Sequence, residues 1–239
     1  MEMDQRAADV QAMFSGIAVR YDLVNDLISL GQHRLWKAET VRRSRSLLGT
    51  TALDLCTGTG DLALLLAEEV GPSGQVVGVD FCDPMLDIAR SRRAEAAGQN
   101  NAPIQYLHGR AESIPLADES VDSCTVAFGL RNVSDLPAAL RETHRVLRPG
   151  GRLVSLDCST PNSPLFGAVF SLYFNRLVPV IGAVVNRSRS AYTYLPNSVG
   201  TFPQKREMCK LMREAGFDSA LYIPLSGGAV AIHVAEKLT

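Results

Sequence analysis

Paired cysteines are missing from this chain. Its five cysteines are odd in number, scattered, and without a C-x-x-C motif; they are Cys56, Cys82, Cys124, Cys158 and Cys209. Each lies in or beside an apolar stretch. This pattern is typical of buried thiols in a reducing compartment, and it argues against a disulfide framework or a zinc site.

Clustered histidines and an excess of one charge are also lacking. The four histidines are dispersed, with no helical spacing that would set two imidazoles on one face, so no metal is expected. The chain has 24 basic and 25 acidic side chains and a formal net charge of -1. Because a nucleic-acid backbone requires a broad positive field, nucleic acid is not an expected partner.

A secretory leader and an uninterrupted membrane span are absent as well. Residues 1–4 carry acid where a secretory signal carries base, so we expect a cytoplasmic protein. The most apolar stretch, residues 165–185, has about the length of a span but contains Asn175, Arg176 and Pro179. It could touch the inner face of the cell membrane, or be buried against the core or in a homodimer interface.

What the chain does have is a regular alternation. From residue 51 onward, short β-rich apolar runs alternate with helical stretches, which predicts a doubly wound α/β fold with a mostly parallel seven-stranded sheet. The last two strands, joined across Ser226-Gly227-Gly228, should form an antiparallel hairpin at one sheet edge. Strands are expected at residues 52–56, 75–79, 104–108, 121–128, 152–157, 217–224 and 229–235, with a helix at 203–215.

A glycine-rich turn follows the first expected strand. The turn bends at Gly58 and Gly60, where the missing side chains let a ligand approach the backbone. About twenty positions later, Asp80 ends the second strand, where a carboxylate can accept both ribose hydroxyls. Together these features predict a nucleoside site, although each alone also suits a turn without a ligand.

The charge of this turn separates two classes of cofactor. A pyrophosphate favours a third glycine and is repelled by anions, whereas here that glycine is absent and Asp54 and Asp61 flank the turn. The sulfonium of S-adenosyl-L-methionine tolerates carboxylates, so this cofactor is favoured over a nicotinamide dinucleotide. Asp54 could equally be a carboxylate bonded to backbone amides, and Asp61 a residue favoured by the helix dipole.

Five segments carry a specific resemblance to one family. They read YDLVNDLISLGQHRLW (21–36), FGLRNV (128–133), RVLRPGGRL (145–153), YTYLPNSV (192–199) and GAVAIH (228–233). They resemble the menaquinone and ubiquinone biosynthesis C-methyltransferases over nearly the whole chain. The resemblance implies the Rossmann-like class I methyltransferase fold and transfer of a methyl group to a prenylated quinol, with demethylmenaquinol favoured.

The resemblance also implies an organisation and a set of cofactor contacts. We expect one domain, with an N-terminal helical cap (1–48), a cofactor-binding core (49–160) and a substrate- and tail-binding segment with closing strands (161–239). The family's cofactor positions fall on Thr59, Asp80, Arg110, Ala111 and Ala127, beside Asp54, Gly58 and Gly60 of the turn.

Three residues depart from the family pattern. Val24 stands where methionine is usual, Asp157 where glutamate is usual, and Arg110 where a small acid or amide usually holds the adenine amino group. Arginine has only donors, so the backbone amide of Ala111 or the carboxylate of Glu112 could take a share of the adenine contacts.

The methyl transfer that the resemblance implies requires activation of a phenol. A phenol has a reference pKa of about 10, and removing its proton makes the neighbouring ring carbon a better nucleophile. We expect Arg131 and Asn132 to stabilise the phenoxide, with Arg131 electrostatic because it stays protonated. Alternatively, Arg131 pairs with a carboxylate such as Asp135.

Further candidates for the quinol site come from the signatures. His33 could be the base, since histidine titrates near neutral pH, or could make a structural hydrogen bond within the cap. Tyr21 is a second catalytic candidate, and Asp22, Tyr192 and Tyr194 are expected at the substrate, although a tyrosine can also be a packed aromatic.

Several rival functions remain open at this point. A ubiquinone precursor or another small phenolic or lipid acceptor would use the same cofactor turn. A non-catalytic scaffold subunit would not need the intact glycines and Asp80. A nicotinamide oxidoreductase would be expected to keep the third glycine.

Overall fold

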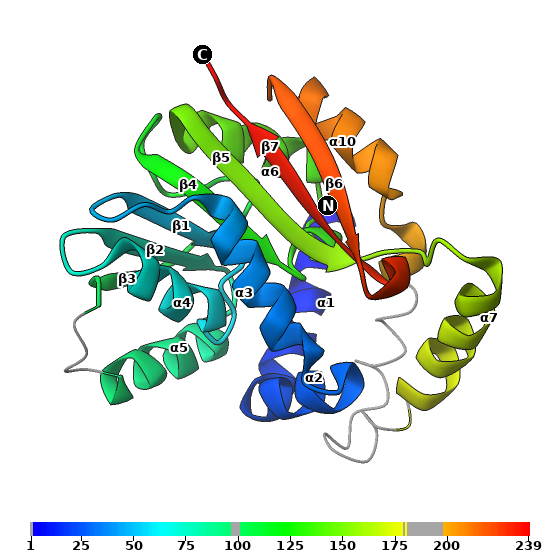
Figure 1. Cartoon of the computed structure of the whole chain (residues 1–239). Coiled ribbons are helices and arrows are strands. Elements are labelled where there is room, and N and C mark those ends of the chain that lie inside the picture. The colour runs from blue at the N-terminus through cyan, green and yellow to red at the C-terminus, as the bar shows by residue number, and fades with distance from the viewer. Residues whose placement is uncertain (1, 97–100, 179, 181–197) are drawn as a thin grey trace.

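The computed structural model describes residues 2–96, 101–178, 180 and 198–239 (Figure 1). Seven strands form one sheet in the order β3-β2-β1-β4-β5-β7-β6. The first five are parallel, and β7 runs antiparallel to both β5 and β6. The strands are β1 (Thr51–Leu55), β2 (Gln75–Asp80), β3 (Ile104–His108), β4 (Val121–Ala127), β5 (Leu147–Cys158), β6 (Ser219–Leu225) and β7 (Val230–Glu236).

Helices cover both faces of this sheet. On one face lie α3 (Gln32–Ser44) and α4 (Asp61–Val70); on the other lie α6 (Leu136–Val146) and α10 (Lys205–Glu214) (Figure 1). Successive residues of a strand point to opposite faces, so Ala52 joins the α4 cluster while Leu53 and Leu55 join the α6 and α10 cluster. This two-sided burial explains the continuous apolar runs and confirms the predicted α/β fold.

The strand predictions differ from the structure mainly at β5. This strand begins at Leu147, not at residue 152, because Leu147 pairs with Val121 before the register shifts to Arg152 opposite Ser123. The amide of Gly150 is held by the carbonyl of Lys237 at 2.7 Å, which keeps a glycine-rich segment in the sheet. The closing hairpin is present as predicted, with the short helix η4 (Ser226–Gly228) between β6 and β7.

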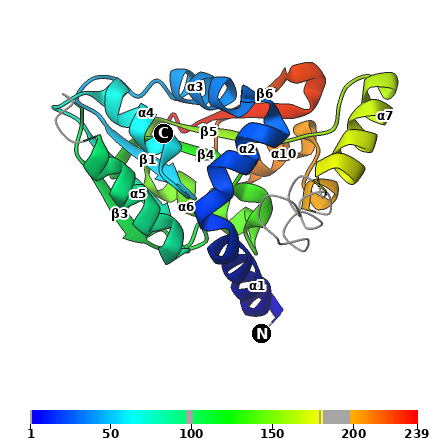
Figure 2. The same cartoon turned by 90° about the horizontal axis from the view of Figure 1, so that it is seen from below.

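The N-terminal segment forms a helical cap at the carboxyl ends of the parallel strands. It consists of α1 (Glu2–Ile17), η1 (Ala18–Arg20), α2 (Tyr21–Ser29) and α3, which continues from the strand ends over one face of the sheet. Figure 2 looks at this side, with α1 and α2 between α5 (Asp83–Glu95) and α7 (Pro164–Leu172). The side-chain amide of Gln11 donates to the carbonyl of Phe81 at 2.7 Å, which ties α1 to the loop after β2.

The apolar stretch at 165–185 is only partly described. Its described part forms α7, the π-helical turn η3 (Tyr173–Leu177) and the buried Val178, which packs with Ile17 and Val24 of the cap. In the described part of the chain, no helix combines the length and the apolar character needed to cross a bilayer. Tyr192 and Tyr194 lie outside the described residues.

Candidate active site

The turn after β1 exposes its backbone. Gly58 and Gly60 both have positive φ, +55° and +85°, which glycine adopts without a steric penalty. A Cβ on Gly58 would meet no protein atom within 4 Å, whereas one on Gly60 would lie 2.7 Å from the Tyr106 hydroxyl. Gly58 therefore leaves room for a ligand, and Gly60 is required by internal packing.

Asp80 is the last residue of β2 and lies beside this turn. One carboxylate oxygen accepts from the amide of Gly58 at 2.8 Å and the other from the amide of Cys82 at 2.9 Å. Burial raises the pKa of Asp80, although the amide bonds oppose that shift. Each oxygen keeps a further lone pair, so the carboxylate can accept two ribose hydroxyls while it stays fixed to the backbone.

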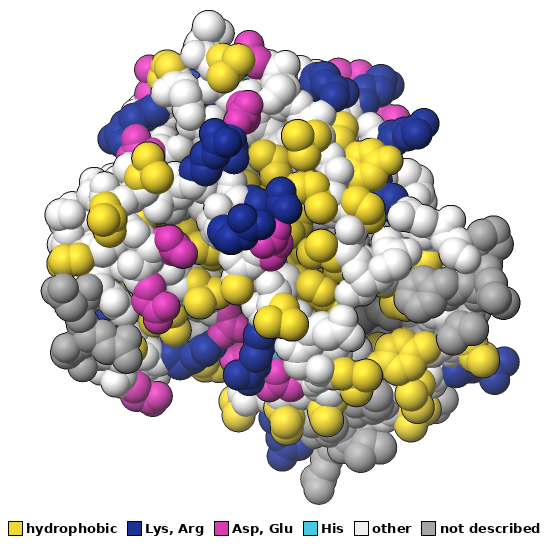
Figure 3. Space-filling view, viewed as in Figure 1, with side chains coloured by type: hydrophobic (Ala, Val, Ile, Leu, Met, Phe, Trp, Pro, Cys, Tyr) yellow, Lys and Arg dark blue, Asp and Glu magenta, His cyan; other side chains and the backbone are white. Residues whose placement is uncertain are grey.

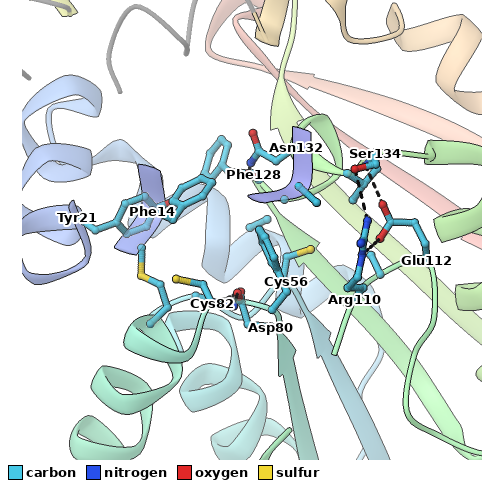
Figure 4. A pocket seen from close by; sticks show the side chains of 18 residues that line it. Phe14, Tyr21, Cys56, Asp80, Cys82, Arg110, Glu112, Phe128, Asn132 and Ser134 are labelled. Atoms are coloured by element: carbon cyan, nitrogen blue, oxygen red, sulfur yellow. Dashed lines mark hydrogen bonds and ion pairs between the residues drawn. The ribbon is translucent and has the colours of Figure 1, made fainter. Parts of the chain in front are cut away.

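A first cavity opens over the turn and Asp80 (Figure 4). It encloses about 650 Å³ including its open mouth. At one end, Arg110 lies 3.5 Å from Glu112 and 3.5 Å from the hydroxyl of Ser134. Of the predicted cofactor residues, the structure brings five to this cavity: Gly58, Asp80, Arg110, Ala111 and Ala127.

The other predicted cofactor residues support the turn from behind. The Asp54 carboxyl accepts from the Thr57 hydroxyl at 2.6 Å and from the Thr125 hydroxyl at 3.3 Å, and burial raises its pKa to about 7. The Thr59 hydroxyl donates to Asp22 at 2.9 Å. Asp54 and Thr59 thus brace the loop, and their role as ligand contacts stays a prediction.

A second cavity lies next to the first. It encloses about 920 Å³ including its mouth and has a mainly apolar lining. The predicted residues His33, Arg131, Asn132 and Tyr21 all line it. Four residues line both cavities: Phe14, Tyr21, Phe128 and Asn132. We call these four residues the shared wall, and ligands bound in the two cavities would be neighbours there.

Arg131 is buried between the sheet and the second cavity. Its guanidinium pairs with Asp157 at 2.8 Å, donates to the Phe128 carbonyl at 2.6 Å and lies 5.6 Å from the Phe128 ring centre. Burial disfavours the charge, but the Asp157 carboxylate outweighs it and keeps the pKa of Arg131 above its ordinary value. Asp135, the alternative partner considered from the sequence, instead caps α6 by accepting from the amide of Ala138.

The strand ends at this wall adopt a rare backbone conformation. Cys56 and Phe128, after β1 and β4, both have positive φ, 56° and 57°. Such strain in non-glycine residues is concentrated at functional sites. The amide of Phe128 is held by the Leu156 carbonyl at 2.7 Å, which directs the Phe128 ring to the boundary between the cavities.

Two of the predicted site residues of the cap, His33 and Asp22, lie in different places. His33 is buried at the second cavity and bonds Asp26 at 2.8 Å. Asp22 faces the cofactor turn, where it bonds Thr59 and Arg92, and not the second cavity where the quinol was expected. Sequence reasoning missed Phe14, which stands in no pattern that points to a ligand. It also missed Asp26, which lies in the segment 21–36 but whose bond to His33 forms only on folding.

A sheet of this order, with a bare glycine turn facing a strand-end carboxylate, defines the class I S-adenosylmethionine-dependent methyltransferases. The fold agrees with such an enzyme from Aquifex aeolicus, at a TM-score of 0.64, 19% identity and coverage of 90% of this chain and 96% of that one. It also agrees with one from Thermotoga maritima, at a TM-score of 0.66, 22% identity and coverage of 95% and 99%. The cofactor is S-adenosyl-L-methionine, and the open space at Gly58 with Asp80 beside it fits its adenosine.

The particular family follows from the sequence comparisons. The profile of the ubiE/COQ5 methyltransferase family matches residues 2–237, and the chain belongs to this family. It is similar to the demethylmenaquinone methyltransferase of Lactococcus lactis, with 42% identity over 95% of this chain and 89% of the relative. It is also similar to the enzymes of that name from Listeria monocytogenes (41%; 95% and 95%) and Staphylococcus epidermidis (38%; 99% and 96%).

Proposed function

We propose that this methyltransferase methylates a ring carbon of demethylmenaquinol and so completes menaquinol. The observation that carries the proposal is the pair of cavities with a shared wall, one polar enough for adenosine and the other large and apolar. The name shared by the similar bacterial enzymes supports the choice of quinol.

The residues of the two cavities divide the work. The bound cofactor supplies an activated methyl group. Gly58 and Asp80 hold its adenosine part, with Arg110 at the far end of the same cavity. Arg131 and Asn132 border the second cavity and stabilise negative charge on the quinol oxygen, while the apolar lining excludes water. Tyr21 orients the ring from the shared wall.

Three other site assignments remain proposals of different kinds. Asp22 acts on the quinol only indirectly, by holding α2 against the cofactor turn through Thr59. Tyr192 and Tyr194 are proposed substrate contacts that lie outside the described residues.

The acceptor is tested by mass spectrometry. Purified protein receives S-adenosyl-L-methionine and, in separate reactions, reduced demethylmenaquinone, a demethylated ubiquinone precursor or a water-soluble naphthol. We expect a gain of one methyl group on the naphthoquinol. Methylation of the benzoquinol alone would move the enzyme to the ubiquinone branch, and methylation of none would contradict the proposal.

We further propose peripheral contact with a membrane surface, because the tail of a prenylated quinol resides in the bilayer. An exposed stripe runs along η1 and α2 at helical spacing and consists of Val19, Leu23, Leu27 and Leu30. Leu172 and Leu177 on α7 and η3 are also exposed. Hydrophobic side chains gather over α2 and near α7 in Figure 3. A homodimer through the same leucines is the competing outcome.

A further inference from the structure

The second cavity contains a buried imidazole with one nitrogen left over. The side chain of His33 is only 4% exposed, and its Nε2 lies 2.8 Å from Asp26 Oδ1. Its Nδ1 is buried and has no hydrogen-bond partner among the described residues. A buried nitrogen without a partner destabilises the fold, so such an atom on a residue that lines a cavity points to a ligand that supplies the missing bond.

The hydrogen bond to Asp26 decides which nitrogen of His33 is left over. Asp26 receives two hydrogen bonds from Arg34, at 2.9 Å on Oδ1 and 2.7 Å on Oδ2. These bonds, and then the bond to His33, hold the pKa of Asp26 well below its usual range. An ionised carboxylate only accepts, so Nε2 of His33 carries the hydrogen and Nδ1 presents a lone pair.

We propose that His33 is the catalytic base for the quinol hydroxyl, and that Asp26 and Arg34 are positioning residues that fix its tautomer. This inference rests on the proposed function. The O–H bond of the quinol breaks and its proton passes to Nδ1. The ring carbon then forms a C–C bond to the methyl group as the C–S bond breaks, and S-adenosylhomocysteine leaves. The ring C–H proton leaves to bulk water at the open mouth of the cavity, and His33 returns its proton to the oxygen, which restores the aromatic quinol.

The other titratable groups at this cavity do not compete for the proton. Burial raises the pKa of Cys158 to about 12 and also raises the pKa of Tyr173, whose hydroxyl donates to the Ile28 carbonyl at 2.9 Å. Arg131 keeps its proton beside Asp157 and supplies positive charge to the oxygen instead. Among the described residues, Tyr21 on α2 also lines this cavity, and Arg34 on α3 binds Asp26, the partner of His33.

The first test measures proton transfer without turnover. The probe is 4-methoxy-1-naphthol, whose ionised form absorbs at longer wavelength, bound in the presence of S-adenosylhomocysteine. We expect ionised naphthol at neutral pH on the unaltered protein and its loss in His33→Gln, which can accept a hydrogen bond but not a proton. Asp26→Asn should give an intermediate loss. Ionised naphthol in His33→Gln would overturn the proposal.

The second test measures turnover with a matched control. His33→Gln should lower kcat by about 100-fold, the contribution typical of a general base, with the S-adenosyl-L-methionine KM unchanged. Glu39→Gln is the control, because Glu39 also receives two arginines on α3 but is half-buried and lines neither cavity. It should keep full activity. If His33→Gln does not fold, the naphthol spectrum and kcat of Asp26→Asn decide, and unaltered values would overturn the proposal.

The two proposals fail in different ways. If the unaltered protein methylates no quinol, the proposed function is wrong. If it methylates demethylmenaquinol and His33→Gln does so equally fast, only the role of His33 is wrong.

Discussion

At the scale of single residues, two glycines with positive φ separate the requirements of folding from those of ligand binding. Gly58 and Gly150 both have positive φ, +55° and +81°, and open space where a Cβ would stand. Alanine at either position should cost about 1 kcal/mol in the free energy of unfolding, because its Cβ disfavours this backbone. Only Gly58→Ala should also weaken S-adenosylhomocysteine binding, as measured by calorimetry. Equal binding by both variants would contradict the cofactor site.

Asp54 gives a prediction about pH. An unfolded aspartate ionises near pH 3.8, whereas burial raises the pKa of Asp54 in the folded protein to about 7. Between these values the folded state binds the extra proton, so this group makes stability fall as pH rises, by about 4 kcal/mol at most. Relative to Asp54→Asn, the unaltered protein should lose urea resistance from about pH 4 to pH 8. Parallel pH profiles for the two proteins would refute this.

Residue-level reasoning from the sequence identified residues that the structure brings to the two cavities, but not the partners of their side chains. The turn, Asp80 and Arg131 could be found because their residue types follow strand ends in a recognisable order. The pairing of Arg131 with Asp157 could not, because it depends on β4 and β5 being neighbours whose carboxyl ends meet. The same holds for His33 and Asp26, which need the chain reversal between α2 and α3.

At the scale of elements, a buried ion pair joins the cap to the core. Lys37 on α3 lies 2.6 Å from Asp61 at the start of α4, and its side chain is only 8% exposed. Lys37→Met should destabilise the protein by about 2 kcal/mol, less than for an isolated buried pair because Arg92 still neutralises Asp61. Arg42→Gln, which breaks an exposed pair with Glu39, should change stability by less than about 0.5 kcal/mol. Urea unfolding measures both, and equal effects would argue against the link.

The strands were the most predictable elements, since apolar runs located all seven within a few residues. The early start of β5 was missed because Pro149, Gly150 and Gly151 indicate a break in any local reading. Its pairing with Val121 of β4 and with Lys237, just after β7, holds that segment in the sheet.

At the scale of the whole molecule, the exposed leucines of α2 predict that the enzyme binds the membrane surface through this helix. The double variant Leu23→Ser and Leu27→Ser should lower sedimentation with anionic phospholipid vesicles by about tenfold, because apolar area drives interfacial binding. Leu47 and Leu48, which are more exposed than Leu23 and Leu27 but precede β1, form the control pair. Unchanged sedimentation of the α2 variant would contradict membrane contact, and a loss of dimers in ultracentrifugation would point to self-association.

The wall formed by Phe14, Tyr21, Phe128 and Asn132 has a pharmacological consequence. Because the two cavities share four lining side chains, one compound could fill both if a short linker joined an adenosine to a naphthol. Tethering makes the second binding event intramolecular, so such a bisubstrate inhibitor should bind far more tightly than either half. Enzymes that have only a cofactor cavity of this kind would bind just the adenosine half. Binding of the naphthol half in the second cavity would make the inhibitor selective for this enzyme.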